Sequence, residues 1–249
     1  MSDAFHSISA PKNTPLFVFG DHASKHIPAE YDNLGLSGDD LTRHIAWDIG
    51  TETIVRYLCE YFGCGGQVAA VSRLVIDLNR DPDAAGLIPA VSDGTHIAAN
   101  ENLSLAARKD RINRFYKPYH SAMGKALDRL EDPFVLSVHS FTPQPKTGDF
   151  RPTDIGLLVK EDVQSAEQFR GALSAAAPHF TVGMNKPYSA YDLNHTIDAN
   201  VAPRGLRHLA IELRQDHIDT QDKARTMARV LAVTLEPLLT RRRIKPITS

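Results

Sequence analysis

Two histidines and a glutamate lie at the ends of short apolar segments of the chain. His22 follows residues 15–20, and His139 follows residues 134–138. Glu212 lies near the end of a third apolar segment, residues 207–213. Imidazole and carboxylate groups are the usual ligands of zinc in catalytic sites. These residues could meet in a metal site, and a chance placement stays open as an alternative because the chain contains 11 histidines.

A carboxylate and a guanidinium follow another apolar segment, at residues 77–80. In open α/β sheets, ligands bind beyond the carboxyl ends of the strands. If these polar segments converge at one sheet edge, they could form a metal site with a substrate clamp.

His44 and Asp48 are four residues apart in an expected helix over residues 38–62, which places them on one helix face. They could form a surface hydrogen bond, or Asp48 could be a metal ligand with His44 as its partner. His22 and His26 have the same spacing, but Pro28 disfavours a helix there.

A serine nucleophile is not expected, because neither Ser24 nor Ser140 lies in a Gly-x-Ser-x-Gly turn. Tyr188 and Tyr191 follow Pro187 in an expected loop. They could line a substrate entrance or pack a turn, and both interpretations stay open.

The elements that must position these side chains alternate along the sequence. Apolar and β-branched segments predict strands over residues 15–20, 67–78, 134–138, 155–159 and 207–213. Helical spacing predicts helices over residues 38–62, 103–130, 166–177 and 220–239, with Pro118 kinking or dividing the second. Residues 87–102 are expected to form an irregular excursion. This alternation indicates an α/β fold with a mixed, mainly parallel sheet and helices on both faces.

The length is compatible with one large α/β domain or two small ones, and the lack of an internal repeat or low-complexity linker favours one domain, residues 1–249. The fractions of hydrophobic and charged residues, 42% and 23%, are ordinary for a globular protein. The net charge of −2 gives no reason to expect nucleic acid or a membrane surface as partner. The basic residues 241–243 are interpreted as a solvated helix end. No segment has the apolar length of a membrane span or a signal peptide, so a cytoplasmic location is expected. Cys59 and Cys64 fit neither a disulfide framework nor a two-pair zinc site.

Five segments, taken together, resemble the N-formylglutamate amidohydrolase family, over about residues 15–220. They are His22-Ala-Ser-Lys-His-Ile-Pro28, Arg43-His-Ile-Ala-Trp-Asp-Ile-Gly50, Ser72-Arg-Leu-Val-Ile-Asp-Leu-Asn-Arg80, Ser137-Val-His-Ser140 and Ile211-Glu-Leu-Arg-Gln-Asp216. That family is similar to zinc carboxypeptidases and aspartoacylases. The resemblance implies a zinc-carboxypeptidase-like fold and one catalytic zinc.

The resemblance also implies the metal ligands. His22 and His139 match the two ligand histidines. The relatives place a glutamate three residues after the first histidine, where this chain has Lys25, so Asp48 is taken as the carboxylate ligand. Glu212 matches the general base of the carboxypeptidase group.

A substrate clamp is implied in the same way. Asn79 and Arg80 match the pair that binds a substrate carboxylate. Arg73 and Arg214 are further candidates for a second substrate carboxylate, and ion pairs with nearby aspartates are the alternative for both.

The expected activity is zinc-dependent hydrolysis of a small N-acylated amino acid, foremost N-formyl-L-glutamate to formate and glutamate. The same site acting on another N-acyl amino acid or a small peptide is one alternative. A non-catalytic anion-binding module that keeps the fold is the other.

Overall fold

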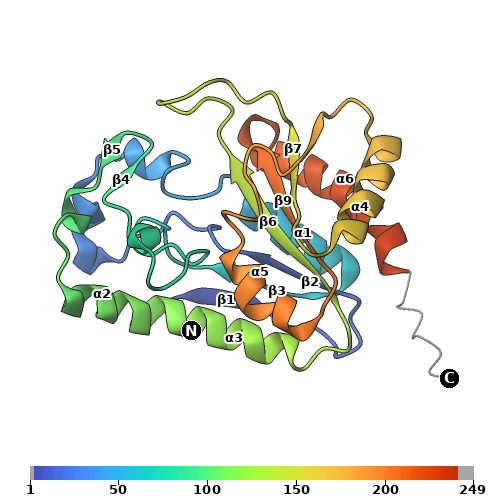
Figure 1. Ribbon diagram of the computed structural model, residues 1–249, viewed down its shortest axis with the longest axis horizontal. Coiled ribbons are helices and arrows are strands. Elements are labelled where there is room, and N and C mark those ends of the chain that lie inside the picture. The colour runs from blue at the N-terminus through green and yellow to red at the C-terminus, as the bar shows by residue number, and fades with distance from the viewer. Residues whose placement is uncertain (1–2, 241–249) are drawn as a thin grey trace.

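The computed structural model describes residues 3–240, built around a seven-stranded sheet in the order β1-β3-β2-β6-β9-β7-β8 (Figure 1). The predicted basic helix end, residues 241–243, lies outside the described residues. The strands are β1 Phe5–Ile8, β2 Leu16–Gly20, β3 Gly65–Ala69, β6 Phe134–Phe141, β7 Ile155–Leu158, β8 Val182–Met184 and β9 His208–Arg214. A separate two-stranded hairpin pairs β4 Val91–Ser92 with β5 Thr95–His96.

The four neighbouring strands β3, β2, β6 and β9 run parallel, so their carboxyl ends meet at one edge of the sheet. β1 is antiparallel to β3, and β7 is antiparallel to β9. The predicted mixed, mainly parallel sheet is therefore confirmed. β1 and β8, which are short and lie at the two edges, were not predicted from the sequence.

Helices cover both faces of the sheet, as predicted (Figure 1). One face packs against α1 Thr51–Phe62, α4 Val163–Ala176 and α6 Gln221–Leu239. The other packs against α3 Lys117–Leu127 and α5 His195–Asn200, and α2 Leu105–Arg111 extends from the α3 end away from the sheet (Figure 1). Strand alternation divides the side chains between these faces, because Leu136 joins the first core and Val135 the second.

The predicted helix over residues 38–62 is wrong in its first half. Residues 43–50 form turns, and α1 begins only at Thr51. Gly50 caps it in the left-handed conformation, with φ of 83°, and a Cβ there would come within 2.4 Å of the Ile218 carbonyl oxygen. The close approach of residue 218 therefore requires glycine and prevents a continuous helix.

Other segments differ from the predicted elements in detail. Residues 70–78 leave the sheet after β3 as a buried, irregular segment. One π-helical turn, Ile112–Tyr116, separates α2 from α3, so Pro118 lies in the first turn of α3 and divides the predicted helix as expected. Short 3-10 turns occupy Ala29–Gly35, Asp40–Thr42, Ala85–Leu87, Ala98–Asn100, Ala202–Arg204 and Gln215–His217.

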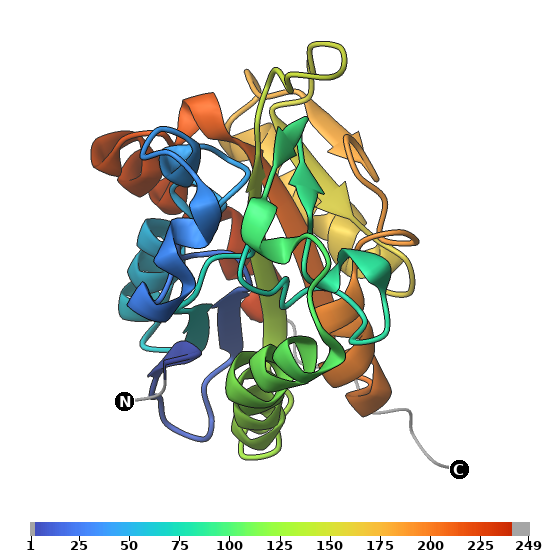
Figure 2. The ribbon, with the colours of Figure 1, turned by 90° about the vertical axis from the view of Figure 1, so that its left-hand side faces the viewer.

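Figure 2 views the molecule from the side of the β4–β5 hairpin, which lies in front of the sheet. This hairpin belongs to the predicted irregular excursion. Cys59 and Cys64 are buried free thiols. Within the described part of the chain, no helix combines the length and apolarity that a bilayer span needs.

Candidate active site

A cavity of about 150 Å³ opens at the carboxyl ends of the parallel strands. Most of its walls are polar, and it is called the site cavity below. It contains two histidines from neighbouring strand ends and the carboxylates that lie between them. Its lining residues include His22, His44, Asp48, Arg73, Asp77, Asn79, Arg80, His139, Tyr188 and Glu212.

His22, Asp48 and His139 lie together and are all buried, with one ligand atom from each within 4.8 Å of the others. Asp48 Oδ2 is 2.9 Å from His139 Nδ1 and 3.4 Å from His22 Nδ1. The backbone N–H of Asp48 donates to the His22 carbonyl oxygen at 2.8 Å. This bond holds the turn before α1 against the end of β2, so Asp48 reaches the strand ends without a helix.

Each histidine presents its other ring nitrogen to a second carboxylate. Asp77 Oδ1 lies 2.7 Å from His22 Nε2, and Asp21 Oδ2 lies 3.6 Å from His139 Nε2. The Tyr119 hydroxyl donates to the other oxygen of Asp21 at 2.7 Å. Such outer carboxylates orient ligand histidines in metal sites and fix which nitrogen faces the ion.

The three inner residues fit a divalent cation. His22 Nδ1 is buried and, within residues 3–240, has no hydrogen-bond partner, although it faces the carboxylate of Asp48. Burial and Arg73 lower the pKa of His22, but Asp77 and Asp48 outweigh them and raise it to about 9. Burial also opposes ionisation of Asp48, yet His22 and His139 hold its pKa well below the usual range. Two nitrogen donors and an ionised carboxylate are the donor set of a catalytic zinc site.

Glu212 lies directly beside this group, because its position in β9 pairs with His139 in β6. Both side chains leave the sheet on the same face, since paired residues of neighbouring strands point the same way. Glu212 is 6% exposed, and its Oε2 has no hydrogen-bond partner among the residues described. Burial raises the pKa of Glu212 to about 7. A buried carboxyl that titrates near neutrality is suited to general acid–base work.

Arg73 and Arg80, two of the predicted binding residues, differ in how closely they contact carboxylates. Arg73 donates to Asp48 Oδ1 at 3.2 Å and to Asp77 Oδ2 at 3.0 Å, so its charge supports the carboxylates of the histidine group. Arg80 also lines the site cavity, and its nearest carboxylate contact is 3.7 Å, to Asp77. The guanidinium of Arg80 is therefore less strongly paired with carboxylates than that of Arg73.

Of the other two predicted substrate-binding residues, Asn79 lies at the site cavity and Arg214 does not. Asn79 lines the site cavity, and its side-chain oxygen accepts the backbone N–H of Thr196 at 2.9 Å. Arg214 is not among the residues that line the cavity. It pairs with Asp154 at 2.9 Å and Asp216 at 2.8 Å, which matches the structural alternative for this arginine.

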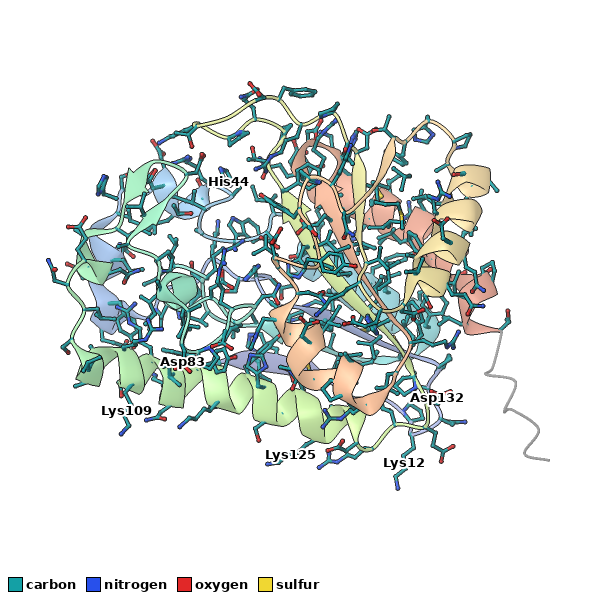
Figure 3. The ribbon with its side chains drawn as sticks, in the orientation of Figure 1. Lys12, His44, Asp83, Lys109, Lys125 and Asp132 are labelled. Atoms are coloured by element: carbon teal, nitrogen blue, oxygen red, sulfur yellow. The ribbon has the colours of Figure 1, made fainter. Side chains whose placement is uncertain are left out.

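The predicted contact between His44 and Asp48 is wrong, because these residues do not share a helix. His44 lies between the β4–β5 hairpin and the sheet (Figure 3), and its Nε2 lies 2.9 Å from Asp93. Lys25 packs over the Trp47 ring at 5.4 Å and lines a different hollow. Tyr188 lines the site cavity, whereas Tyr191 is 72% exposed.

Sequence reasoning did not assign Asp21 a place near the site, and it included Asp77 only as the carboxylate of the polar segment 77–80. One signal was available, because both aspartates come directly after or near the end of an apolar segment. Their partners lie 118 and 55 positions away, respectively. No local pattern encodes contacts across such separations.

Comparisons with known proteins show a family and solved structures to which the chain is similar. The family model described as N-formylglutamate amidohydrolase matches residues 14–218. Gene product Atu2144 from Agrobacterium tumefaciens is 31% identical, with a TM-score of 0.87 over 94% of this chain and 96% of that one. N-formylglutamate amidohydrolase from Ralstonia eutropha JMP134 is 20% identical, with a TM-score of 0.65 over 95% and 97% of the two chains, which shows a shared fold. Among curated proteins, none matches.

The family match spans every strand of the parallel core and all the residues that line the site cavity. Sequence, fold and comparison therefore agree, and the chain belongs to the N-formylglutamate amidohydrolase family.

Proposed function

We propose that this protein hydrolyses the amide bond of N-formyl-L-glutamate, giving formate and glutamate, with one zinc ion held by His22, Asp48 and His139. Membership of an amidohydrolase family supports the reaction class. The observation that carries the proposal is the unpaired, buried carboxyl of Glu212, in register with His139 and beside a donor set suited to a metal. A buried acid without a partner is costly to keep, and a role in proton transfer accounts for it.

A zinc ion at this position would supply Lewis acidity, which polarises the amide carbonyl and activates a water molecule. Glu212 Oε2 accepts the proton that the water loses as its oxygen bonds to the formyl carbon. Glu212 then delivers this proton to the amide nitrogen as the carbon–nitrogen bond breaks. The outer carboxylates Asp77 and Asp21 hold the two imidazoles in a fixed orientation throughout.

Arg80, supported by Asn79, binds one carboxylate of the substrate. Both residues line the site cavity, and the nearest carboxylate contact of Arg80 among the described residues, to Asp77, is 3.7 Å long. The Asn79 side chain is fixed by its bond from the Thr196 backbone. Holding the substrate in this way aligns its amide with the reacting groups before the chemical step.

Two other functions use the same residues. The site could accept another N-acyl amino acid or a small peptide, but the small volume of the site cavity favours the smallest acyl group. The fold could also serve as an anion-binding module without catalysis. Glu212 argues against this alternative, because a site that only binds an anion gives no reason to keep a buried carboxyl whose Oε2 has no hydrogen-bond partner within residues 3–240.

The proposed function is tested with the formyl, acetyl and succinyl derivatives of glutamate, assayed side by side on protein loaded with zinc. We expect kcat/KM to be highest for the formyl compound. Treatment with a chelator should abolish the activity, and added zinc should restore it. Stoichiometric zinc with no hydrolysis of any of the three compounds would contradict the proposed reaction, and full activity after chelation would contradict the proposed metal.

Zinc affinity should rise with pH. His22 has a pKa of about 9 in the metal-free protein, so at pH 7 its imidazole carries a proton that the ion must displace. The apparent association constant should therefore increase roughly tenfold per pH unit from pH 6 to 8. Isothermal titration calorimetry in buffers of different ionisation enthalpy should show at least about one proton released per zinc at pH 7. An affinity that does not change over this range would exclude His22 as a ligand that is protonated in the free site.

A further inference from the structure

A second hollow, of about 280 Å³, adjoins the site cavity. His44, Arg73 and Tyr188 line both spaces, so the two spaces meet at these side chains. Its far wall comes from the β4–β5 hairpin and from the loop that joins β6 to β7, which reaches toward the hairpin in Figure 1. This space is called the outer hollow below.

Asp93 fixes the wall of the outer hollow. Its carboxylate accepts the backbone N–H groups of Lys146 and Thr147 at 3.0 and 3.3 Å, which ties the β6–β7 loop to the hairpin. The same carboxylate pairs with Arg43 at 3.2 Å and with His44 at 2.9 Å. Four donors satisfy Asp93, so this acid leaves little negative potential to repel an anion from the hollow.

Arg151 is a half-buried cation that lines the outer hollow. Its guanidinium donates to the Tyr188 hydroxyl at 2.8 Å and to the Thr142 carbonyl oxygen at 3.3 Å. Its centre also lies 4.9 Å from the centre of the Tyr188 ring. These contacts hold the side chain in place, yet no carboxylate between residues 3 and 240 forms an ion pair with it.

Two other arginines at or next to the outer hollow are committed to acids, whereas Arg80 lies in the site cavity. Arg73 is bound to Asp48 and Asp77, and Arg43 is bound to Asp40 and Asp93. A partly buried guanidinium loses hydration, and a carboxylate is the partner that best replaces it. Arg151 is therefore preorganised for an anion that the described chain does not supply.

We infer that Arg151 binds the second carboxylate of an N-acyl dicarboxylic amino acid, the one on its side chain, and so determines the specificity of the site. This inference rests on the proposed function, because it assumes that one carboxylate is held by Arg80 in the site cavity. The outer hollow then takes the end of the substrate that extends past Tyr188. Arg151 consequently sets the preference of the proposed site for an acidic over a neutral amino acid.

The test compares N-formylglutamate with N-formylglutamine, which replaces the side-chain carboxylate by an amide of the same shape. The wild-type protein should favour N-formylglutamate. In Arg151→Met the ratio of the two kcat/KM values should fall about 10- to 100-fold, since a charge-assisted hydrogen bond is lost. Most of the change should lie in KM, because the contact forms with the substrate before the reaction.

Arg207→Met is the matched control. Arg207 is also half-buried, lies 5.7 Å from the Phe134 ring centre and donates to a backbone carbonyl, but it does not line either space. This variant should keep the wild-type ratio. If Arg151 only supports Tyr188, Arg151→Met will lower kcat/KM for both substrates by the same factor, and this outcome would overturn the inference.

Calorimetric titration of the zinc-loaded protein with L-glutamate and L-glutamine separates the inference from the proposed function. Suppose that neither formyl compound is hydrolysed, but glutamate binds more tightly than glutamine and Arg151→Met removes the difference. The proposed reaction then fails, and Arg151 remains the group that binds the second carboxylate. If N-formylglutamate is hydrolysed and neither measurement depends on Arg151, the reaction stands and the inference fails. If there is no hydrolysis and no dependence on Arg151, both fail.

Discussion

Replacing Glu212 with glutamine should lower kcat for N-formylglutamate by about 10²- to 10⁴-fold, the usual contribution of a positioned general acid–base group. Glutamine keeps the shape of the side chain but cannot take a proton from the attacking water. KM should change little, because no contact with the substrate carboxylates is proposed for Glu212. Steady-state kinetics on zinc-loaded protein measures both constants.

Thermal stability provides the control for the Glu212 variant. Burial raises the pKa of Glu212 to about 7, so above that pH the wild-type protein holds a buried charge that the fold does not favour. An uncharged glutamine removes this charge, and the metal-free variant should melt no lower than the wild type at pH 8. Glu212→Asp, which keeps a carboxylate, should recover part of the rate. A glutamine variant with full kcat would rule out Glu212 as the proton carrier.

The sequence predicted the parallel core of the fold and the placement of two histidines. Apolar segments that end in polar residues marked β2, β6 and β9, and parallel strands necessarily bring such ends to one edge. Neighbouring register then explains why His139 and Glu212 lie side by side. These features follow from local patterns together with the geometry of parallel sheets.

Asp48 lies beside the two histidines, as expected, but a turn positions it and not the predicted helix. The apolar spacing of residues 41, 45 and 49 suggested a helix that would carry Asp48 and His44 on one face. The approach of Ile218 to Gly50 instead ends the helical conformation and leaves Asp48 in a turn bonded to the His22 backbone. Contacts between such distant segments override local periodicity.

Arg151 was not singled out from the sequence, because nothing in its own segment marks it. Its significance depends on the lack of an ion-pair partner for it among residues 3–240 and on the wall built by Asp93 and the β6–β7 loop. Arg214, which the sequence did suggest, is held by Asp154 and Asp216. The pairing of each arginine is a property of the tertiary structure, so the sequence could not separate them.

Replacing His139 with alanine should remove most of the bound zinc and reduce hydrolysis by at least about 10³-fold. The substitution deletes one of three proposed ligands, and the loss of Lewis acidity alone accounts for several kcal/mol of transition-state stabilisation. It also frees the Asp48 carboxylate from its 2.9 Å contact with the ring. Elemental analysis of protein purified without chelator and the N-formylglutamate assay measure the two effects separately.

His208→Ala controls for the loss of a buried ring from the same sheet. His208 is 7% exposed and lies at the start of β9, where its Nδ1 donates to the Leu206 carbonyl oxygen at 2.9 Å and Val135 is its partner in β6. Its removal should lower stability in the way that a cavity does, while the zinc content stays stoichiometric. His208 belongs to the first pair of the β6–β9 register, whereas His139 lies four pairs further toward the carboxyl edge. A loss of zinc in the His139 variant alone therefore reflects a role at that edge and not the loss of a buried ring. Retention of zinc and of the full hydrolytic rate in His139→Ala would remove the basis of the proposed mechanism, whatever the effect on stability.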